Sequence, residues 1–214
     1  MLVAIYIHVY PVNDYLDILR GFYAENPLLF KNSEINIRVT DTLRSRDGIS
    51  KIKSVFNQDI SLKLVRDDYE FPTIEEIHTR SKQSEDNIKI LYIHTKGVTT
   101  PNNICIKEWR DYMSYFLIGR YKICLDALDK YNTCAVDFRF DPCAHYSGNF
   151  WWANSYYLQS LKSVKDVSSP LTERHKCEFW VCSGKDSKNH SIYDSKINAF
   201  ERHLTRYPRR LYES

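Results

Sequence analysis

The sequence lacks most of the short motifs that assign a protein to a common enzyme class. No Gly-x-Gly-x-x-Gly follows the first apolar segment, so a Rossmann dinucleotide site is not supported, and there is neither a P-loop nor a Gly-x-Ser-x-Gly nucleophile elbow. No apolar run is long enough to span a membrane, and residues 1–10 have neither the basic segment nor the cleavage site of a signal peptide. These absences favour a protein of the cytoplasm.

Cysteine pairs at metal-binding or redox spacing are also missing. Six cysteines are present, but no two form a Cys-x-x-Cys motif. Cys177 and Cys182 are five residues apart, and no second pair accompanies them. Reduced, partly buried thiols are therefore expected, and a zinc site built with His175 is the weaker alternative.

Neither positive nor negative charge is in large excess. The net charge is +3 over 214 residues and the basic residues are scattered, which does not indicate a nucleic-acid-binding surface. The basic cluster at 206–210 is expected to be a solvated or partner-contacting end. The length suffices for one well-buried core and falls short of two full domains. We expect a single domain over residues 1–214, which is also compatible with a place in a larger modular enzyme.

Apolar periodicity predicts an α/β fold. In the first half, strands are expected at 2–10, 34–40, 60–65 and 88–93, helices at 13–24 and 73–83, a cap at Asn13 or Asp14, and a turn at Asp47-Gly48. In the second half, helices are expected at 106–131, 154–163 and 194–205, a strand at 133–138, a short strand or helical turn at 177–182, and a polar loop at 183–192. Strands that alternate with helices predict a mostly parallel sheet with helices outside it.

The strand predicted at 88–93 ends in polar residues. Its apolar composition suits a strand buried on both faces, and it stops at His94-Thr95-Lys96-Gly97. The carboxyl ends of buried strands are where open α/β sheets bind ligands. Gly97 lets the backbone approach a ligand, Lys96 adds a positive charge, and His94 can donate, accept or bind a metal. An ordinary polar turn is the alternative interpretation.

Two later segments combine aromatic and polar side chains, a mixture that suits a sugar or a nucleobase. In the segment 145–152, Gly148 predicts a tight turn that presents Ser147 and Asn149. Because adjacent side chains on a strand point to opposite faces, one of Trp151 and Trp152 is expected in the core and the other in a cleft. The alternative is that both pack in the core.

The segment 174–180 places Glu178 between apolar residues. A carboxylate in such a setting can act as a general base. The alternative is an ion pair with Arg174, four residues earlier, if the segment is helical.

Together these motifs resemble a family of glycosyltransferases with the GT-A fold, found in large DNA viruses and bacterial polysaccharide clusters and related to rhamnan-synthesis-type transferases. The matching motifs are Tyr92-Ile-His94-Thr-Lys96-Gly97, Trp109-Arg110, Ser147-Gly-Asn-Phe-Trp-Trp-Ala153 and Glu178-Phe-Trp180, with a looser match at Tyr69-Glu70-Phe-Pro72-Thr73. The resemblance implies a central, mostly parallel sheet flanked by helices. It also implies transfer of a sugar from a UDP- or dTDP-sugar to a glycan or glycoprotein acceptor, with inversion, in the host cytoplasm for a viral member.

The resemblance further implies roles for individual residues. Glu178 falls where inverting members carry their base, and His145 is the second candidate for that role. The nucleotide would be bound by His8, Val9, Tyr10, Glu70, Thr73, Arg80, His94, Lys96 and Gly97. The sugar and acceptor would be held by Ser147, Gly148, Asn149, Trp151, Trp152 and Trp180.

The cofactor expectation has two forms. GT-A enzymes usually carry Asp-x-Asp after this strand, which holds Mn²⁺ or Mg²⁺ on the donor diphosphate, whereas this chain has His94-Thr95-Lys96. Either Lys96 supplies part of the metal's charge, or His94 or a nearby aspartate keeps a metal. Two other functions stay open: a non-catalytic carbohydrate-binding module on the same fold, and a hydrolase or phosphotransfer enzyme that acts on a nucleotide sugar or phosphate.

Overall fold

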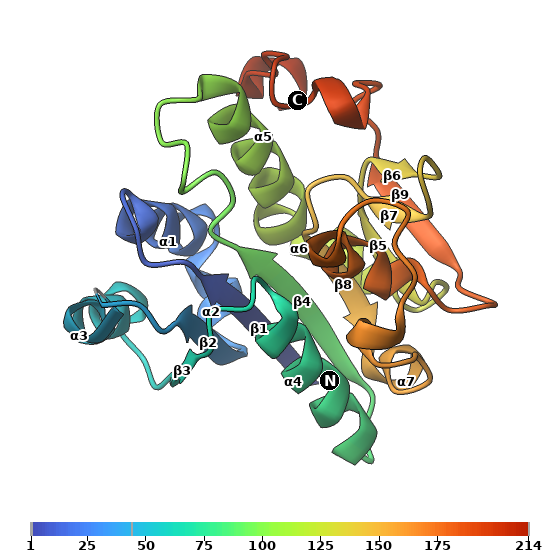
Figure 1. The fold of residues 1–214 in the computed structure, drawn as a ribbon, viewed down its shortest axis with the longest axis horizontal. Helices are drawn as coiled ribbons and strands as arrows, with labels where there is room; N and C mark the ends of the chain where they lie inside the picture. The colour runs from blue at the N-terminus through green and yellow to red at the C-terminus, as the bar shows by residue number, and fades with distance from the viewer. Residues whose placement is uncertain (1, 44, 214) are drawn as a thin grey trace.

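The computed structural model describes residues 2–43 and 45–213, and these form a seven-stranded mixed sheet with helices around it and a separate two-stranded ribbon (Figure 1). The sheet order is β3-β2-β1-β4-β8-β5-β9, and the ribbon pairs β6 with β7. The strands are β1 (Leu2–Val9), β2 (Glu34–Thr40), β3 (Ser61–Val65), β4 (Ile88–His94), β5 (Thr133–Val136), β6 (Phe138–Arg139), β7 (His145–Tyr146), β8 (Trp151–Asn154) and β9 (Asn189–Tyr193). In the sheet only β8 runs antiparallel to its neighbours, so the predicted mostly parallel sheet is confirmed.

The helices cover the sheet and extend beyond one end of it. They are α1 (Tyr15–Glu25), α2 (Pro27–Lys31), α3 (Ser45–Phe56), α4 (Phe71–Gln83), α5 (Ile104–Ser114), α6 (Tyr121–Ala127), α7 (Ser155–Leu158) and α8 (Lys176–Phe179). The crossovers β1-α1-β2 and β3-α4-β4 run in opposite directions along the sheet, so right-handed connections place α1 and α4 on opposite faces. Figure 1 shows α4 across the front of the sheet and α5 beyond the end of β4.

The register between β1 and β4 decides where the polar residues meet. The two strands are parallel, and His8 lies opposite His94 at their carboxyl ends. Their apolar parts are in the core, with Ile5, Ile7 and Ile90 fully buried. Because β1 connects to β2 on one side while β4 lies on the other, this pair of strand ends is a topological switch point.

Several sequence predictions of secondary structure are wrong. Asp47-Gly48 is not a turn but part of α3, and a Cβ at Gly48 would press against the hydroxyl of Tyr15. The predicted helix at 194–205 is absent from the described chain apart from a 3-10 turn at Ala199–Glu201, and β9 forms within the predicted polar loop. β9 is an edge strand with half-buried residues, which explains why it lacks an apolar pattern.

Other elements differ in extent. The helix predicted at 106–131 is divided by a π-helical turn at Tyr115–Gly119, and the one predicted at 154–163 is only α7. The segment 177–182 takes the helical alternative, as the end of α8 and a 3-10 turn at Trp180–Cys182. The predicted cap of α1 is not formed, because Asp14 makes no capping bond and the Asn13 amide donates instead to the Val98 carbonyl, at 2.7 Å.

The C-terminal segment folds back over α5. Arg206 pairs with Glu108, Arg209 pairs with Glu25 at the end of α1, and Tyr212 is buried. Arg206 and Arg209 therefore form ion pairs within this chain while their side chains stay exposed to solvent, in keeping with the solvated alternative. None of the described helices is both long and apolar enough to cross a membrane.

Candidate functional site

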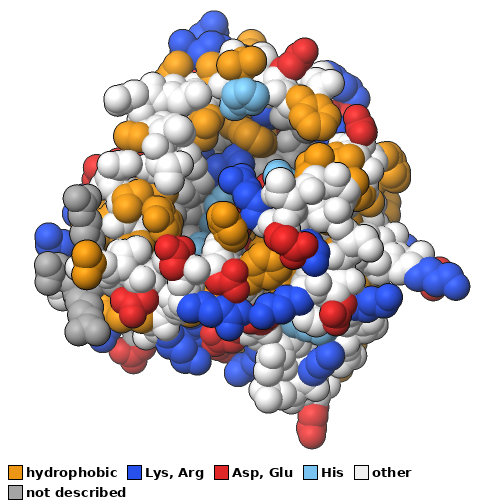
Figure 2. All heavy atoms as spheres, viewed as in Figure 1, with side chains coloured by type: hydrophobic (Ala, Val, Ile, Leu, Met, Phe, Trp, Pro, Cys, Tyr) orange, Lys and Arg blue, Asp and Glu red, His pale blue; other side chains and the backbone are white. Residues whose placement is uncertain are grey.

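A cleft of about 580 Å³, here called the main cleft, opens at the carboxyl ends of β1 and β4. Figure 2 shows this face hollowed near its centre, with basic side chains and histidine in the hollow. The lining residues are His8, Tyr10, Asp67, Asp68, Tyr69, Glu70, His94, Thr95, Lys96, Gly97, Val98, Thr99 and Arg174. Six of the nine residues predicted to bind a nucleotide are therefore brought together at this switch point.

His8 forms the floor of the main cleft. Its Nδ1 lies 2.7 Å from the Thr73 hydroxyl and its Nε2 lies 3.3 Å from the Thr40 hydroxyl. Burial lowers the pKa of His8 to about 4, so the ring is neutral at pH 7. Because hydroxyls occupy both ring nitrogens, His8 and Thr73 form a buried polar support beneath the cleft. Val9 is fully buried and does not line it.

Arg80 does not belong to this site. It pairs with Glu34 at the start of β2, with 3.2 Å between Arg80 Nη2 and Glu34 Oε2. Glu34 is level with Ala4 near the start of β1, so the carboxyl ends of β1 and β4 lie at the opposite end of the strands. Arg80 follows Thr73 by seven residues in α4, which amounts to about 10 Å along a helix. The prediction that Arg80 binds the nucleotide is therefore wrong.

The loop after β4 is held by backbone contacts on both sides. The Thr95 amide donates to the His8 carbonyl at 3.1 Å, and the Thr95 hydroxyl accepts from the Tyr10 amide at 3.0 Å. Arg110 Nη1 donates to the Lys96 carbonyl at 2.7 Å. Gly97 has φ +81°, and a Cβ there would lie 2.4 Å from Cγ2 of Ile106. These contacts fix the direction in which Lys96 leaves the backbone.

Replacing Gly97 by alanine is expected to destabilise the protein by about 1–3 kcal/mol, because the residue would be forced into a left-handed conformation and against Ile106. Urea unfolding measures the change. The matched control is Gly21→Ala in α1, where a Cβ meets no atom within 4 Å and the helix favours alanine. Equal stability of the Gly97 variant and the wild type would contradict the strain argument.

Lys96 presents a cation without a carboxylate partner. Its Nζ lies 4.0 Å from the ring centroid of Trp109, a cation–π contact, and it forms no ion pair with any residue that the structure describes. Burial lowers the pKa of Lys96, while the charges of Glu178 and Glu70 act to raise it. A partly buried ammonium of this kind is suited to receive an anion.

Glu70 and His94 lie opposite each other beside Lys96. Glu70 Oε1 is 3.6 Å from His94 Nδ1, and His94 Nε2 is 3.1 Å from the Gly148 carbonyl. Since a carbonyl can only accept, Nε2 carries the proton of the neutral ring and Nδ1 faces Glu70 as an acceptor. Burial, followed by the charge of Glu178, raises the pKa of Glu70, and burial, followed by the charge of Lys96, lowers that of His94.

Glu178 lines a smaller space of about 120 Å³, here called the small hollow, together with Trp109, Asp141, Pro142, His145, Ser147, Gly148, Leu171, Phe179 and Phe200. Glu178 is half-buried in α8, and among the described residues it forms no ion pair with Arg174, the alternative partner considered from sequence. His145 Nδ1 lies 2.8 Å from the Cys143 carbonyl, so it carries the proton and Nε2 is an acceptor. Both candidate bases therefore line one hollow beside Trp109.

The turn predicted at Ser147-Gly148-Asn149 is present. Gly148 has φ +98°, and the Asn149 amide donates to the Tyr146 carbonyl at 3.1 Å. Ser147 and Gly148 line the small hollow. Asn149 is buried, its Oδ1 accepts from Trp151 Nε1 at 3.2 Å, and its Nδ2 is buried without a partner.

The predicted sugar-stacking tryptophans are core residues instead. Trp151, Trp152 and Trp180 are 0% exposed. The Trp152 indole N–H donates to the Leu117 carbonyl at 2.8 Å and that of Trp180 to the Lys162 carbonyl at 2.9 Å. The expectation that one of the adjacent pair lines a cleft is therefore wrong, and so is sugar binding by Trp180. The indole that lines the site is Trp109 of α5.

Sequence reasoning missed three charged residues of the main cleft, namely Asp67, Asp68 and Arg174. The adjacent aspartates before α4 were visible as a pair of carboxylates, and Arg174 was considered only as a partner of Glu178. Arg174 extends from a 3-10 turn at Glu173–His175, which lies about eighty residues from β4 in sequence. Only the tertiary fold brings it to the cleft.

A divalent metal does not fit this set of residues. No group of three His, Cys, Asp or Glu side chains within residues 2–43 and 45–213 is arranged to hold a metal ion. At the end of β4, where the resemblance implies Asp-x-Asp, the chain carries the Lys96 ammonium. A cation at this position repels a metal ion instead of binding it.

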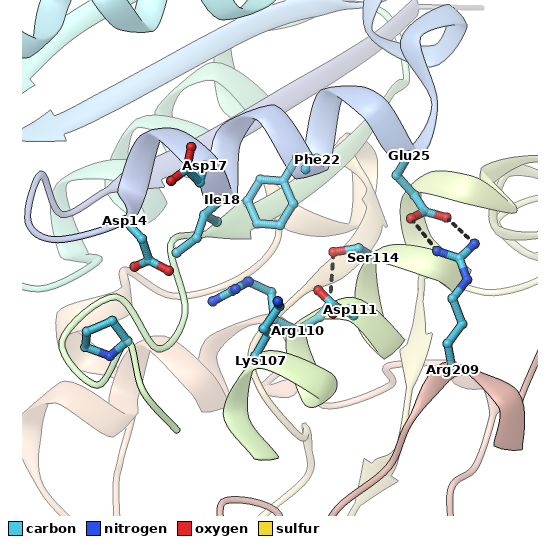
Figure 3. A pocket seen from close by; sticks show the side chains of 12 residues that line it. Asp14, Asp17, Ile18, Phe22, Glu25, Lys107, Arg110, Asp111, Ser114 and Arg209 are labelled. Atoms are coloured by element: carbon cyan, nitrogen blue, oxygen red, sulfur yellow. Dashed lines mark hydrogen bonds and ion pairs between the residues drawn. The ribbon is translucent and has the colours of Figure 1, made fainter. Parts of the chain in front are cut away.

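A second cavity of about 500 Å³ lies between α1 and α5 (Figure 3). Its acidic and basic side chains face one another, and Figure 3 shows Glu25 paired with Arg209. Arg110, which lines this cavity, also bonds to the Lys96 carbonyl. The second cavity therefore adjoins the loop that carries Lys96, and Arg110 is the lining residue that bonds to that loop.

Solved structures share the fold at low sequence identity. A candidate nucleotide-diphospho-sugar transferase from Desulfovibrio desulfuricans G20 is 9% identical with a TM-score of 0.53, covering 91% of this chain and 81% of that one. S. aureus TarS is 10% identical with a TM-score of 0.50, covering 95% of this chain and 63% of that one, so this chain spans less than two thirds of the TarS chain. The fold is therefore that of nucleotide-diphospho-sugar transferases, as the GT-A resemblance implied.

Comparison with curated proteins finds no match. A family model described as "Domain of unknown function (DUF8361)" matches residues 30–193. The match covers more than half of the chain and includes β4, α5 and α8. The chain therefore belongs to the DUF8361 family.

Proposed function

We propose that the protein is a glycosyltransferase that moves a sugar from a UDP- or dTDP-sugar to a glycan or glycoprotein acceptor with inversion. One observation carries the proposal: Lys96, a cation that forms no ion pair with any described residue, and a carboxylate, Glu178, flank Trp109 at the switch point of the sheet. The first suits a diphosphate and the second an acceptor hydroxyl. The finer resemblance to the rhamnan-synthesis-like group belongs to the same proposal.

The reaction assigns one step to each group. Glu178 accepts the proton of the acceptor hydroxyl as that oxygen attacks the anomeric carbon of the donor sugar. The bond between this carbon and the diphosphate oxygen breaks, and its electron pair leaves with the diphosphate. Attack from the face opposite the leaving group inverts the anomeric carbon, and the transition state has oxocarbenium character, as in glycoside hydrolysis.

Two neighbouring groups support these roles. Burial, followed by the charge of Glu178, raises the pKa of Glu70, and the charges of Lys96 and Arg174 act in the opposite direction. His94 is neutral because its pKa is lowered, and it joins the end of β4 to the turn at Gly148. The donor side of the site in the main cleft is thereby connected to the acceptor side in the small hollow.

Nucleotide binding should raise the melting temperature. A ligand that binds only the native state at about 100 times its Kd adds about 2.7 kcal/mol, which corresponds to about 5–10 °C for a chain of this length. The screen compares UDP, dTDP and their sugars with ribose 5-phosphate as a control. A folded sample that responds to no nucleotide but to a glycan would favour the carbohydrate-binding module. Release of free sugar without an acceptor would favour the hydrolase.

A further inference from the structure

We propose that the side chains of Lys96 and Arg174, and not a divalent metal, neutralise the donor diphosphate in the main cleft. This inference rests on the proposed function, since it concerns the diphosphate of the same nucleotide sugar. It starts from the conflict between the metal that the fold family implies and the residues that stand at the end of β4.

The surroundings of Lys96 keep its charged side chain in the cleft. The backbone on either side of it is fixed by the Arg110 bond to its carbonyl and by the left-handed Gly97. Its ammonium lies 4.0 Å from the Trp109 ring centroid, and no carboxylate in the described chain forms an ion pair with it. An indole face stabilises the cation without using its N–H donors, so these stay available for phosphate oxygens.

The residues around Lys96 leave no place for a metal beside it. Glu70 faces the ring of His94, and Asp68 is paired with Arg66 at 3.0 Å. A dication bound by Glu70 would lie near both Lys96 and Arg174, whose charges already act on this carboxylate. Both cations would repel a metal ion bound at this carboxylate.

Arg174 supplies the second charge. Its side chain is exposed at the rim of the main cleft and forms no ion pair with any described residue, since the neighbouring Glu173 pairs with Lys176 at 2.9 Å. The diphosphate of a nucleotide sugar carries two negative charges. One ammonium and one guanidinium balance them and can donate charge-assisted hydrogen bonds to both phosphate groups.

The test measures binding of UDP and of uridine by thermal shift and calorimetry, in EDTA and in Mn²⁺. Wild-type protein is expected to bind UDP equally well in both. Lys96→Met should weaken UDP binding by about 10- to 150-fold, as loss of a hydrogen bond to a charged group implies, and leave uridine binding unchanged. Arg174→Gln should also weaken UDP binding. The control Lys107→Met removes the same charge from the second cavity and should change neither affinity.

Each result decides the matter. UDP binding that requires Mn²⁺, or that is unchanged in Lys96→Met, would overturn this inference and leave the proposed function standing. An equal loss of uridine affinity would mean that Lys96 acts through the structure of the cleft, which also overturns it. If Lys96→Met does not fold, Lys96→Arg keeps the charge and should bind UDP in EDTA, and its failure to do so would count against the inference. Absence of nucleotide binding in every condition would overturn the proposed function as well.

Discussion

Replacing Glu178 by glutamine is expected to lower the rate of sugar transfer by about 10²- to 10⁴-fold, because the amide cannot accept the proton of the acceptor hydroxyl. Folding should be preserved, since Glu178 is half-buried and forms no ion pair with any described residue. Donor binding should also be unchanged, because the side chain lines the small hollow and not the main cleft. Transfer to a glycan acceptor measures the rate, and the melting temperature with UDP measures binding.

Two further variants test the assignment of the base to Glu178. Glu173→Gln removes a carboxylate five residues earlier whose side chain is 80% exposed and paired with Lys176, and it should transfer sugar at the wild-type rate. His145→Gln removes the second candidate base from the same hollow. Full activity in Glu178→Gln together with loss in His145→Gln would assign the base to His145.

Replacing Arg202 by methionine is expected to lower the free energy of unfolding by about 3 kcal/mol, the lower end of the range for breaking one side of a buried ion pair. Arg202 is fully buried, and its Nη2 lies 3.0 Å from Oδ2 of Asp137, which is also fully buried. Its guanidinium also lies 4.6 Å and 4.8 Å from the ring centroids of Tyr112 and Tyr207. The loss falls at the low end because Arg139 still pairs with Asp137, and because Nε and Nη1 of Arg202 form no hydrogen bond with any described residue.

Chemical denaturation measures this second effect. The control is Arg210→Met, which removes an exposed arginine from the same C-terminal segment and should change stability by no more than about 0.5 kcal/mol. A loss in Arg202→Met no larger than that of the control would contradict the argument that the buried Asp137–Arg202 pair stabilises the fold.

The fold was predictable where a strand is buried. The alternating residues 34–40 and the apolar residues 88–93 give β2 and β4 nearly the predicted bounds, because β-branched apolar residues favour buried strands. β9 was missed because an edge strand is defined by its partner β5 and not by its own composition. The dipeptide Asp47-Gly48 lies inside the helix α3 and not in a turn. Gly48 packs closely against Tyr15 there.

The candidate site divides in the same way. His94, Lys96 and Gly97 were predictable, since the end of a buried strand fixes their place. The buried Trp151, Trp152 and Trp180 were misassigned because aromatic composition does not distinguish a core indole from one that lines a cleft. Arg174 was missed as a cleft residue because its position depends on the path of the chain between α7 and α8, which no local pattern encodes.

The return of the C-terminal segment to α5 has a consequence for synthesis on the ribosome. β1 to β4 can pair with one another once the first hundred residues have emerged, whereas β8, the other neighbour of β4, is made later. The indole beneath Lys96 gains its contact with Arg202, at 5.8 Å, only when nearly the whole chain has been made. During translation these strands can therefore form early, and the packing around Trp109 beneath Lys96 is completed late. A nascent chain that stops before residue 202 has the strand ends but lacks the contact of Arg202 with this indole.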